Sequence, residues 1–125
     1  MITAVHNLVY SSDPEATRAF FRDVLRFSSV DAGGGWLIFK TGPSELGVHP
    51  NTWQDDGVPG GTDQRFEISL ICDDLAATMA ELTARGAVLG ETDEADWGAT
   101  VRVEVPGAGS MLIFEPKFPP PALGD

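Results

Sequence analysis

The sequence has a single cysteine, few basic residues and no long hydrophobic run. Its one cysteine, Cys72, excludes an internal disulfide. Cys72 lies in the apolar run SLIC, so we expect a buried, unreactive thiol and regard a nucleophilic role as the less favoured alternative. No apolar stretch approaches the roughly 20 residues that a membrane span needs, and no basic segment followed by an apolar one opens the chain. These absences predict a cytoplasmic protein.

Basic residues are scarce relative to acidic ones. Eight lysines and arginines against 19 aspartates and glutamates give a formal net charge of -11. This charge opposes phosphate backbones and anionic lipid surfaces, so we expect neither nucleic acid nor a membrane as a partner. The same charge favours a cationic ligand, although solubility alone is a sufficient reason for it.

The length allows one compact domain. With 125 residues, 42% of them hydrophobic, the chain can bury one core and is too short for two independent ones. We therefore predict a single domain over residues 1–125.

Within this domain, two segments follow the same pattern. Residues 5–21 and 66–82 each pass from strand-like alternation to an amphipathic helical pattern behind an aspartate that can cap the helix. This similarity indicates one structural unit used twice. With residue 6 aligned to residue 67, the identical pairs are Asp13/Asp74, Ala16/Ala77 and Thr17/Thr78.

Each unit is predicted to have the order βαβββ. Gly33–Gly35 is interpreted as a hairpin turn, because no Lys-Ser/Thr and no helix follow it as in a phosphate-binding loop. In module one, residues 1–50, the strands are predicted at 3–10, 28–31, 36–41 and 44–49, with a helix from Asp13 to near Arg26. In module two, residues 65–116, they are predicted at 65–72, 87–89, 97–105 and 111–115, with a helix from Asp73 or Asp74 to Arg85-Gly86.

The remaining segments are predicted to be irregular. Residues 51–64 are dense in Pro, Gly, Asn and Asp and are interpreted as the linker between the modules. Residues 90–96 form an acidic segment that lacks the ligand spacing of a calcium loop, so a solvated loop is expected. Residues 117–125 form a Pro-rich tail.

Four short motifs carry a family resemblance. They are D-P-E-A-T at 13–17, D-D-L-A-A-T at 73–78, P-G-A-G at 106–109 and F-E-P at 114–116. In their places within the repeat they resemble the vicinal oxygen chelate superfamily, which includes glyoxalase I, bleomycin-resistance proteins and extradiol dioxygenases. The resemblance implies an α+β fold in which two βαβββ modules form a cup-shaped, barrel-like sheet with helices on its outer face. It also implies a homodimer.

The resemblance further implies where a metal would bind. Enzymes of the superfamily place metal ligands at positions that fall here on His6, Leu46, Glu67 and Leu112, so only His6 and Glu67 can ligate. A catalytic metal needs at least three protein ligands and an open position. A third could come from Glu45, His49, Glu104 or Glu115, but strand alternation turns Glu45, His49 and Glu115 away from the face of Leu46 and Leu112.

The cup suggests a mainly apolar site for a small molecule. The candidate ligand-binding residues are His6, Tyr10, Leu46, Glu67, Leu112 and Phe114. The favoured hypothesis is a glyoxalase- or bleomycin-resistance-like protein that binds an organic ligand and has no resident cofactor. One alternative is a lyase, isomerase or dioxygenase that uses a divalent metal on His6, Glu67 and a third ligand. Another is a metal-free enzyme in which His6 and Glu67 act as an acid/base pair.

Overall fold

The structure is a computed structural model that describes residues 7, 9, 11–44, 50–64 and 66–117. Its helices are α1 (Pro14–Ala19), the π-helical turn η1 (Phe20–Val24) and α2 (Leu75–Ala84). Its strands are β1 (Ser28–Asp31), β2 (Leu37–Lys40), β3 (Thr52–Asp55), β4 (Val58–Gly61), β5 (Ser69–Ile71), β6 (Asp93–Ala95), β7 (Gly98–Val105) and β8 (Gly109–Pro116).

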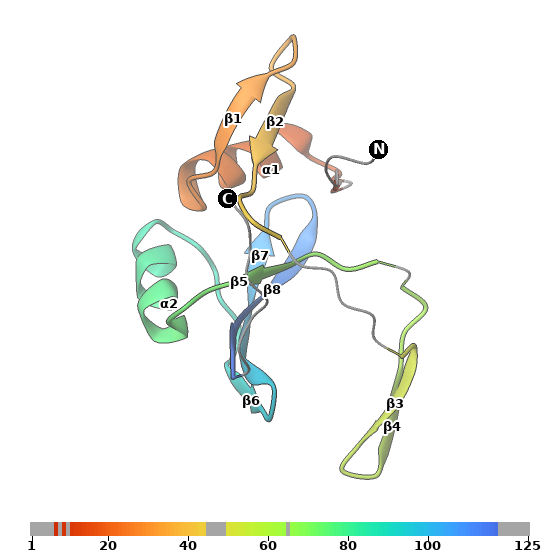
Figure 1. Ribbon diagram of the computed structural model, residues 1–125. Helices are drawn as coiled ribbons and strands as arrows, with labels where there is room; N and C mark the ends of the chain where they lie inside the picture. Colours follow the sequence, from red (N-terminus) through yellow and green to blue (C-terminus); the bar gives the residue numbers. More distant parts are fainter. Residues whose placement is uncertain (1–6, 8, 10, 45–49, 65, 118–125) are drawn as a thin grey trace.

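The strands form two hairpins and one larger sheet (Figure 1). The hairpins are β1–β2 and β3–β4, and the larger sheet has the order β5-β8-β7-β6. The α+β class is confirmed, whereas the sheets of the described residues do not close into a barrel. In the same part of the chain, no helix is long and apolar enough to cross a membrane.

The second module has the order βαβββ, with β6 in place of the strand predicted at 87–89. β5 pairs with β8 in parallel, and β8–β7 and β7–β6 pair in antiparallel fashion. Successive side chains of β7 point to opposite faces, as the alternating sequence predicts. Val101, Val103 and Val105 are at most 2% exposed, whereas Arg102 and Glu104 between them are exposed. The sheet therefore has one core face and one open face.

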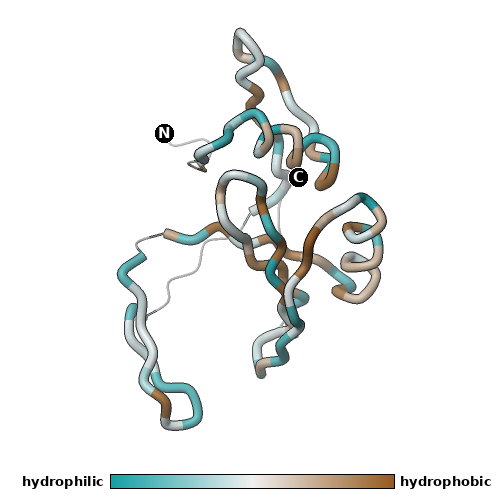
Figure 2. Tube along the Cα trace, turned by 180° about the vertical axis from the view of Figure 1, so that it is seen from behind, coloured by the Kyte–Doolittle hydropathy of each residue, from teal (hydrophilic) through white to brown (hydrophobic). Residues whose placement is uncertain are grey.

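Helix α2 covers the core face. Asp74 caps the helix, since its side chain accepts a hydrogen bond from the Ala77 amide at 3.0 Å. Leu75 and Leu82 are buried in the same cluster as the valines of β7 and as Ile113 of β8. Hydrophobic residues accordingly concentrate in this part of the chain, while the hairpin β3–β4 is largely hydrophilic (Figure 2).

The first module is described only in part. Asp13 caps α1 and Pro14 occupies its first turn, as predicted. In β1–β2, Gly33–Gly35 adopt positive φ and form the predicted hairpin turn, where the Asp31 carboxylate accepts from two glycine amides. The predicted strands at 3–10 and 44–49 lie largely outside the described residues. The complete order of module one therefore stays a prediction.

The segment predicted as an irregular linker contains a hairpin instead. β3 and β4 are joined by Asp56-Gly57, and both turn residues have positive φ, 48° and 78°. Asp-Gly is a preferred pair for such two-residue turns, because the twist of the turn matches that of the strands. This local signal outweighs the overall density of Pro and Gly in the segment.

Module two differs from its prediction at three places. The strand predicted at 65–72 is limited to β5, and the one predicted at 87–89 is reduced to a single bridge between Leu89 and Val103. The acidic loop contains β6, which pairs with the start of β7 through a tight turn. Pairing with a long neighbouring strand thus imposes strand geometry on acidic residues of low strand propensity.

The two modules meet at the start of α1. Thr17 is 5% exposed and is the only buried polar side chain among the described residues. Its hydroxyl lies within hydrogen-bond distance of Ser11 Oγ and of the carbonyl oxygens of Asp13 and Pro106. The Ser12 amide donates to the Gly107 carbonyl at 2.8 Å. The motif D-P-E-A-T is therefore bonded to the β7–β8 turn, P-G-A-G.

Close contact at this junction requires glycine at position 107. Its φ is +78°, and a Cβ there would lie 2.5 Å from Ser11 Oγ. The aromatic ring of Phe20, one turn further along the helix, is 6% exposed and joins the core of module two. Hydrogen bonds and apolar packing thus hold α1 and η1 against the larger sheet.

We expect Thr17→Val to lower the free energy of unfolding by about 1 kcal/mol, because it removes the buried Thr17 hydroxyl that donates to the Pro106 carbonyl. The matched control is Thr78→Val, at the equivalent position of α2. The Thr78 hydroxyl donates to the Asp74 carbonyl of its own helix, at 2.8 Å, and also interacts with the Cys72 side chain of the same module. Urea denaturation followed by circular dichroism measures both variants, and equal losses would contradict the role of Thr17 at the junction.

Candidate functional site

The open face of the larger sheet holds three of the predicted site residues. Leu112 and Phe114 of β8 alternate with core residues and point away from α2, and Glu67 lies two residues before β5. By strand register, Leu112 lies between Ser69 and Arg102, and Phe114 lies between Ile71 and Thr100. His6, Tyr10 and Leu46, the other predicted site residues, lie outside the described residues.

Much of the open face is apolar and accessible. Leu112 and Phe114 are half-buried, and Ile71 beside Phe114 is 41% exposed. The Trp97 ring meets Phe114 edge-on, with 5.5 Å between the ring centroids, and is itself 46% exposed. Aromatic and aliphatic side chains thus form a patch on which a flat apolar molecule could lie.

A basic residue that the sequence analysis missed lies beside this patch. Arg102 of β7 is the direct cross-strand neighbour of Leu112, and its Nη1 lies 3.9 Å from Glu67 Oε1. Its Nε donates to Ser110 Oγ at 2.8 Å and its Nη2 to the Ser110 carbonyl at 3.2 Å. The alternation of Val101, Arg102 and Val103 is the signal that could have placed Arg102 on the open face.

The position of Arg102 bears on the predicted metal site. Glu67 was expected to face His6, which lies outside the described residues; among the described residues the Glu67 carboxylate pairs with the Arg102 guanidinium. No group of three or more His, Cys, Asp or Glu residues in the described part of the chain could hold a metal ion. The acidic segment at residues 90–96, which contains β6, likewise has no such group.

Two of the four candidate third ligands, Glu104 and Glu115, are among the described residues. Glu115 faces away from Leu112, as alternation predicts, and its Oε1 accepts from the Leu75 amide at 3.1 Å, at the start of α2. Glu104 lies on the open face, paired with Ser110 across the strands, and is exposed. Glu45 and His49 lie outside the described residues.

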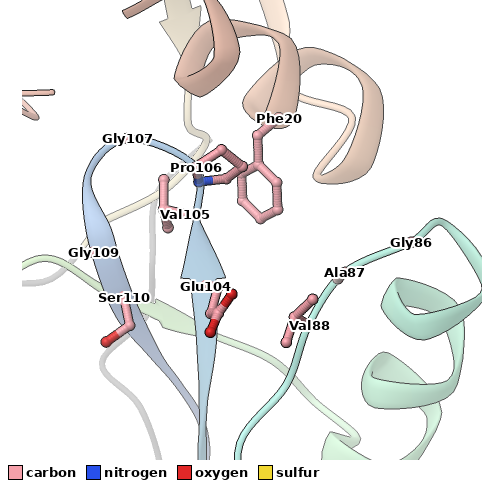
Figure 3. A pocket seen from close by; sticks show the side chains of 10 residues that line it. All are labelled: Phe20, Gly86, Ala87, Val88, Glu104, Val105, Pro106, Gly107, Gly109 and Ser110. Atoms are coloured by element: carbon pink, nitrogen blue, oxygen red, sulfur yellow. The ribbon is translucent and has the colours of Figure 1, made fainter. Parts of the chain in front are cut away.

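A groove of about 560 Å³ adjoins the end of the open face, between η1 and the β7–β8 turn (Figure 3). Phe20 forms one wall, and the rest is lined by Val88, Glu104, Val105, Pro106 and Ser110 together with Ala87 and three glycines. Its one charged side chain is Glu104. The groove is therefore a concave surface with a single carboxylate, and it lacks the three ligands that a metal ion needs.

Cys72 lies on the core side of this sheet. The thiol is half-buried, and its Sγ lies 3.6 Å from the Phe114 carbonyl oxygen. Burial raises the pKa of Cys72 above its ordinary value, because the thiolate would lose solvation. The raised pKa favours the unreactive thiol that the sequence predicts.

We expect Cys72 in the native protein to react with a disulfide reagent at neutral pH at least tenfold more slowly than in the urea-unfolded chain. Its folded pKa is raised, so the unfolded state loses this proton first. Stability should therefore fall as pH rises through the ordinary thiol range. Stopped-flow absorbance measures the rate, and Cys72→Ala should remove that component of the pH dependence. Equal rates for native and unfolded chains would contradict the prediction.

Comparison with known proteins identifies the fold. No protein-family model and no curated protein matches the chain. Among solved structures, a glyoxalase/bleomycin resistance protein/dioxygenase superfamily member from Sphaerobacter thermophilus is 25% identical, with a TM-score of 0.59 over 91% of this chain and 98% of that one.

Two further structures are similar. An antibiotic-binding protein from a Streptomyces species is 18% identical, with a TM-score of 0.57 over 93% of this chain and 100% of that one. A lactoylglutathione lyase from Agrobacterium tumefaciens is 19% identical, with a TM-score of 0.58 over 86% and 88%. The chain therefore has the fold of the glyoxalase/bleomycin-resistance/dioxygenase superfamily, which confirms its resemblance to the vicinal oxygen chelate proteins.

Proposed function

We propose that this protein binds a small organic molecule on the open face of the sheet β5-β8-β7-β6, without a resident catalytic metal. The observation that carries the proposal is the accessible patch of Leu112, Phe114 and Trp97 beside Arg102 and Glu67. A mainly apolar surface with a few polar groups is the usual composition of a small-molecule site. The likeness to an antibiotic-binding protein supports the same class of function.

Two contacts support binding without a metal. Arg102 places a positive charge beside Glu67, and a metal on that carboxylate would be repelled by it. Glu115, a candidate third ligand, is engaged at the start of α2. Leu112 contributes no ligand atom. The alternatives, a metal on His6 and Glu67 or an acid/base pair of the two, both depend on residues outside the described part of the chain.

We also propose that the protein is a homodimer. The hairpin β3–β4 extends away from the larger sheet in both views (Figures 1 and 2), and seven of its eight residues are exposed. A two-stranded hairpin is marginally stable unless it packs against another surface. A second copy of the chain would supply that surface. A cytoplasmic location, consistent with the free thiol of Cys72, completes the proposal.

The binding function is tested by titrating neutral, cationic and anionic aromatic compounds of two or three rings against tryptophan fluorescence. At least one class should bind, and Phe114→Ala should weaken its binding about tenfold, because the ring forms part of the patch. The matched control is Phe66→Ala, whose side chain is 92% exposed before β5 and should have no effect.

Two results together would overturn the proposed function. The first is a flat fluorescence response across the whole panel. The second is stoichiometric metal after reconstitution, measured by elemental analysis, together with metal-dependent turnover. Retained binding in Phe114→Ala, with loss in Phe66→Ala, would instead place the site elsewhere.

The homodimer is tested at the tip of the hairpin. Val58 is 66% exposed, and Val58→Asp should weaken dimerisation at least tenfold by placing a charge in the apolar part of the interface. Val88→Asp, a change at a residue 57% exposed in module two, is the matched control. Sedimentation velocity over a concentration series measures the association. A wild-type chain that stays monomeric would contradict the proposal.

A further inference from the structure

The Arg102 guanidinium is held in one orientation and has unused donors. Ser110 accepts from both Nε and Nη2, which fixes the plane of the group. A guanidinium has five N–H groups, and Ser110 accepts from two of them. Its ion-pair partner, Glu67 Oε1, is 3.9 Å from Nη1, beyond hydrogen-bond distance. Arg102 therefore presents N–H groups that have no acceptor among the described residues.

The contact with Glu67 is weak enough to be replaced. Both side chains are 51% exposed, and exposed ion pairs at this distance contribute little to stability. A ligand carboxylate could instead form two parallel hydrogen bonds with the guanidinium, an arrangement that is shorter and stronger. The net charge of -11 opposes an anion at long range, but salt screens this repulsion beyond about 8 Å under physiological conditions.

The apolar patch lies at a distance from the Arg102 guanidinium that an aromatic acid can span. The guanidinium bonds to Ser110, and Leu112 and Phe114 follow two and four residues further along the same face, about 7 Å and about 13 Å from Ser110. Trp97 extends the aromatic surface beyond Phe114. A two-ring aromatic acid could therefore place its carboxylate at Arg102 and its rings over Leu112, with the outer ring directed towards Phe114.

We infer that Arg102 anchors an acidic group, and that the open face selects aromatic carboxylates over neutral or cationic aromatic compounds of the same shape. The inference rests on the proposed ligand site and specifies its ligand class. It reverses the expectation from composition alone, because the acidic chain presents a single basic side chain on this face of the described residues. Glu67 then competes with the ligand for Arg102.

The test compares 2-naphthoate with 2-naphthamide, which have the same rings and differ in charge. Isothermal titration calorimetry should show that 2-naphthoate binds the wild-type protein about tenfold more tightly. Arg102→Gln should remove this preference and leave the affinity for 2-naphthamide within about twofold. Arg102→Lys should give an intermediate preference, because it keeps the charge and loses the two parallel donors.

Glu67→Gln tests most directly whether Glu67 competes with the ligand for Arg102. If Glu67 competes for Arg102, the variant should bind 2-naphthoate about threefold to tenfold more tightly and 2-naphthamide unchanged. The control is Arg22→Gln, which disrupts an ion pair of similar exposure with Asp23, away from this sheet. It should alter neither affinity. Circular dichroism verifies that each variant is folded.

The outcomes separate this inference from the proposed function. Equal binding of the two probes to the wild-type protein, or weaker binding of 2-naphthoate to Glu67→Gln, would overturn the role of Arg102 while the binding function stands. Failure of both probes and of the whole aromatic panel would overturn the binding function as well. A preference for 2-naphthoate that survives Arg102→Gln would assign the anion site to another residue.

Discussion

The bond between the Thr17 hydroxyl and the Pro106 carbonyl is the contact on which the arrangement of the molecule depends. It fixes the start of α1 against the turn that joins β7 to β8. That turn sets the register of the two strands, and a slip of one residue would exchange the core and open faces. The position of Arg102 opposite Leu112 thus depends on a turn that module one holds in place.

The two modules use their repeated residues differently. Thr17 and Thr78 stand at equivalent positions, yet Thr17 bonds across the module boundary, whereas the contacts of Thr78 with Asp74 and Cys72 lie within module two. At the start of α2 the corresponding contact is made by Glu115, whose carboxylate accepts from the Leu75 amide. Equivalent helix ends are therefore stabilised by a neighbouring turn in one module and by a neighbouring strand in the other.

Sequence periodicity was sufficient where an element depends on its own residues. The valines of β7, the stripe of Leu75 and Leu82 and the glycines after Asp31 led to correct predictions, because alternation, helical spacing and positive φ are local properties. The hairpin β3–β4 was missed although Asp56-Gly57 marks its turn. The pairing of Arg102 with Glu67 lay beyond sequence reasoning, because it depends on parallel pairing of β5 with β8, 40 or more residues apart.

The same pairing brings Leu112, Arg102 and Glu67 together on the open face. Leucine at position 112 has no metal-ligating atom, and the arginine opposite it places a positive charge next to the Glu67 carboxylate. A divalent cation on Glu67 would have to displace the guanidinium or tolerate its charge, and either requirement lowers affinity. An anionic ligand would be attracted by Arg102, since its contact with the guanidinium would replace the weaker contact between Arg102 and Glu67. Arg102 therefore favours acid recognition over metal binding on this surface.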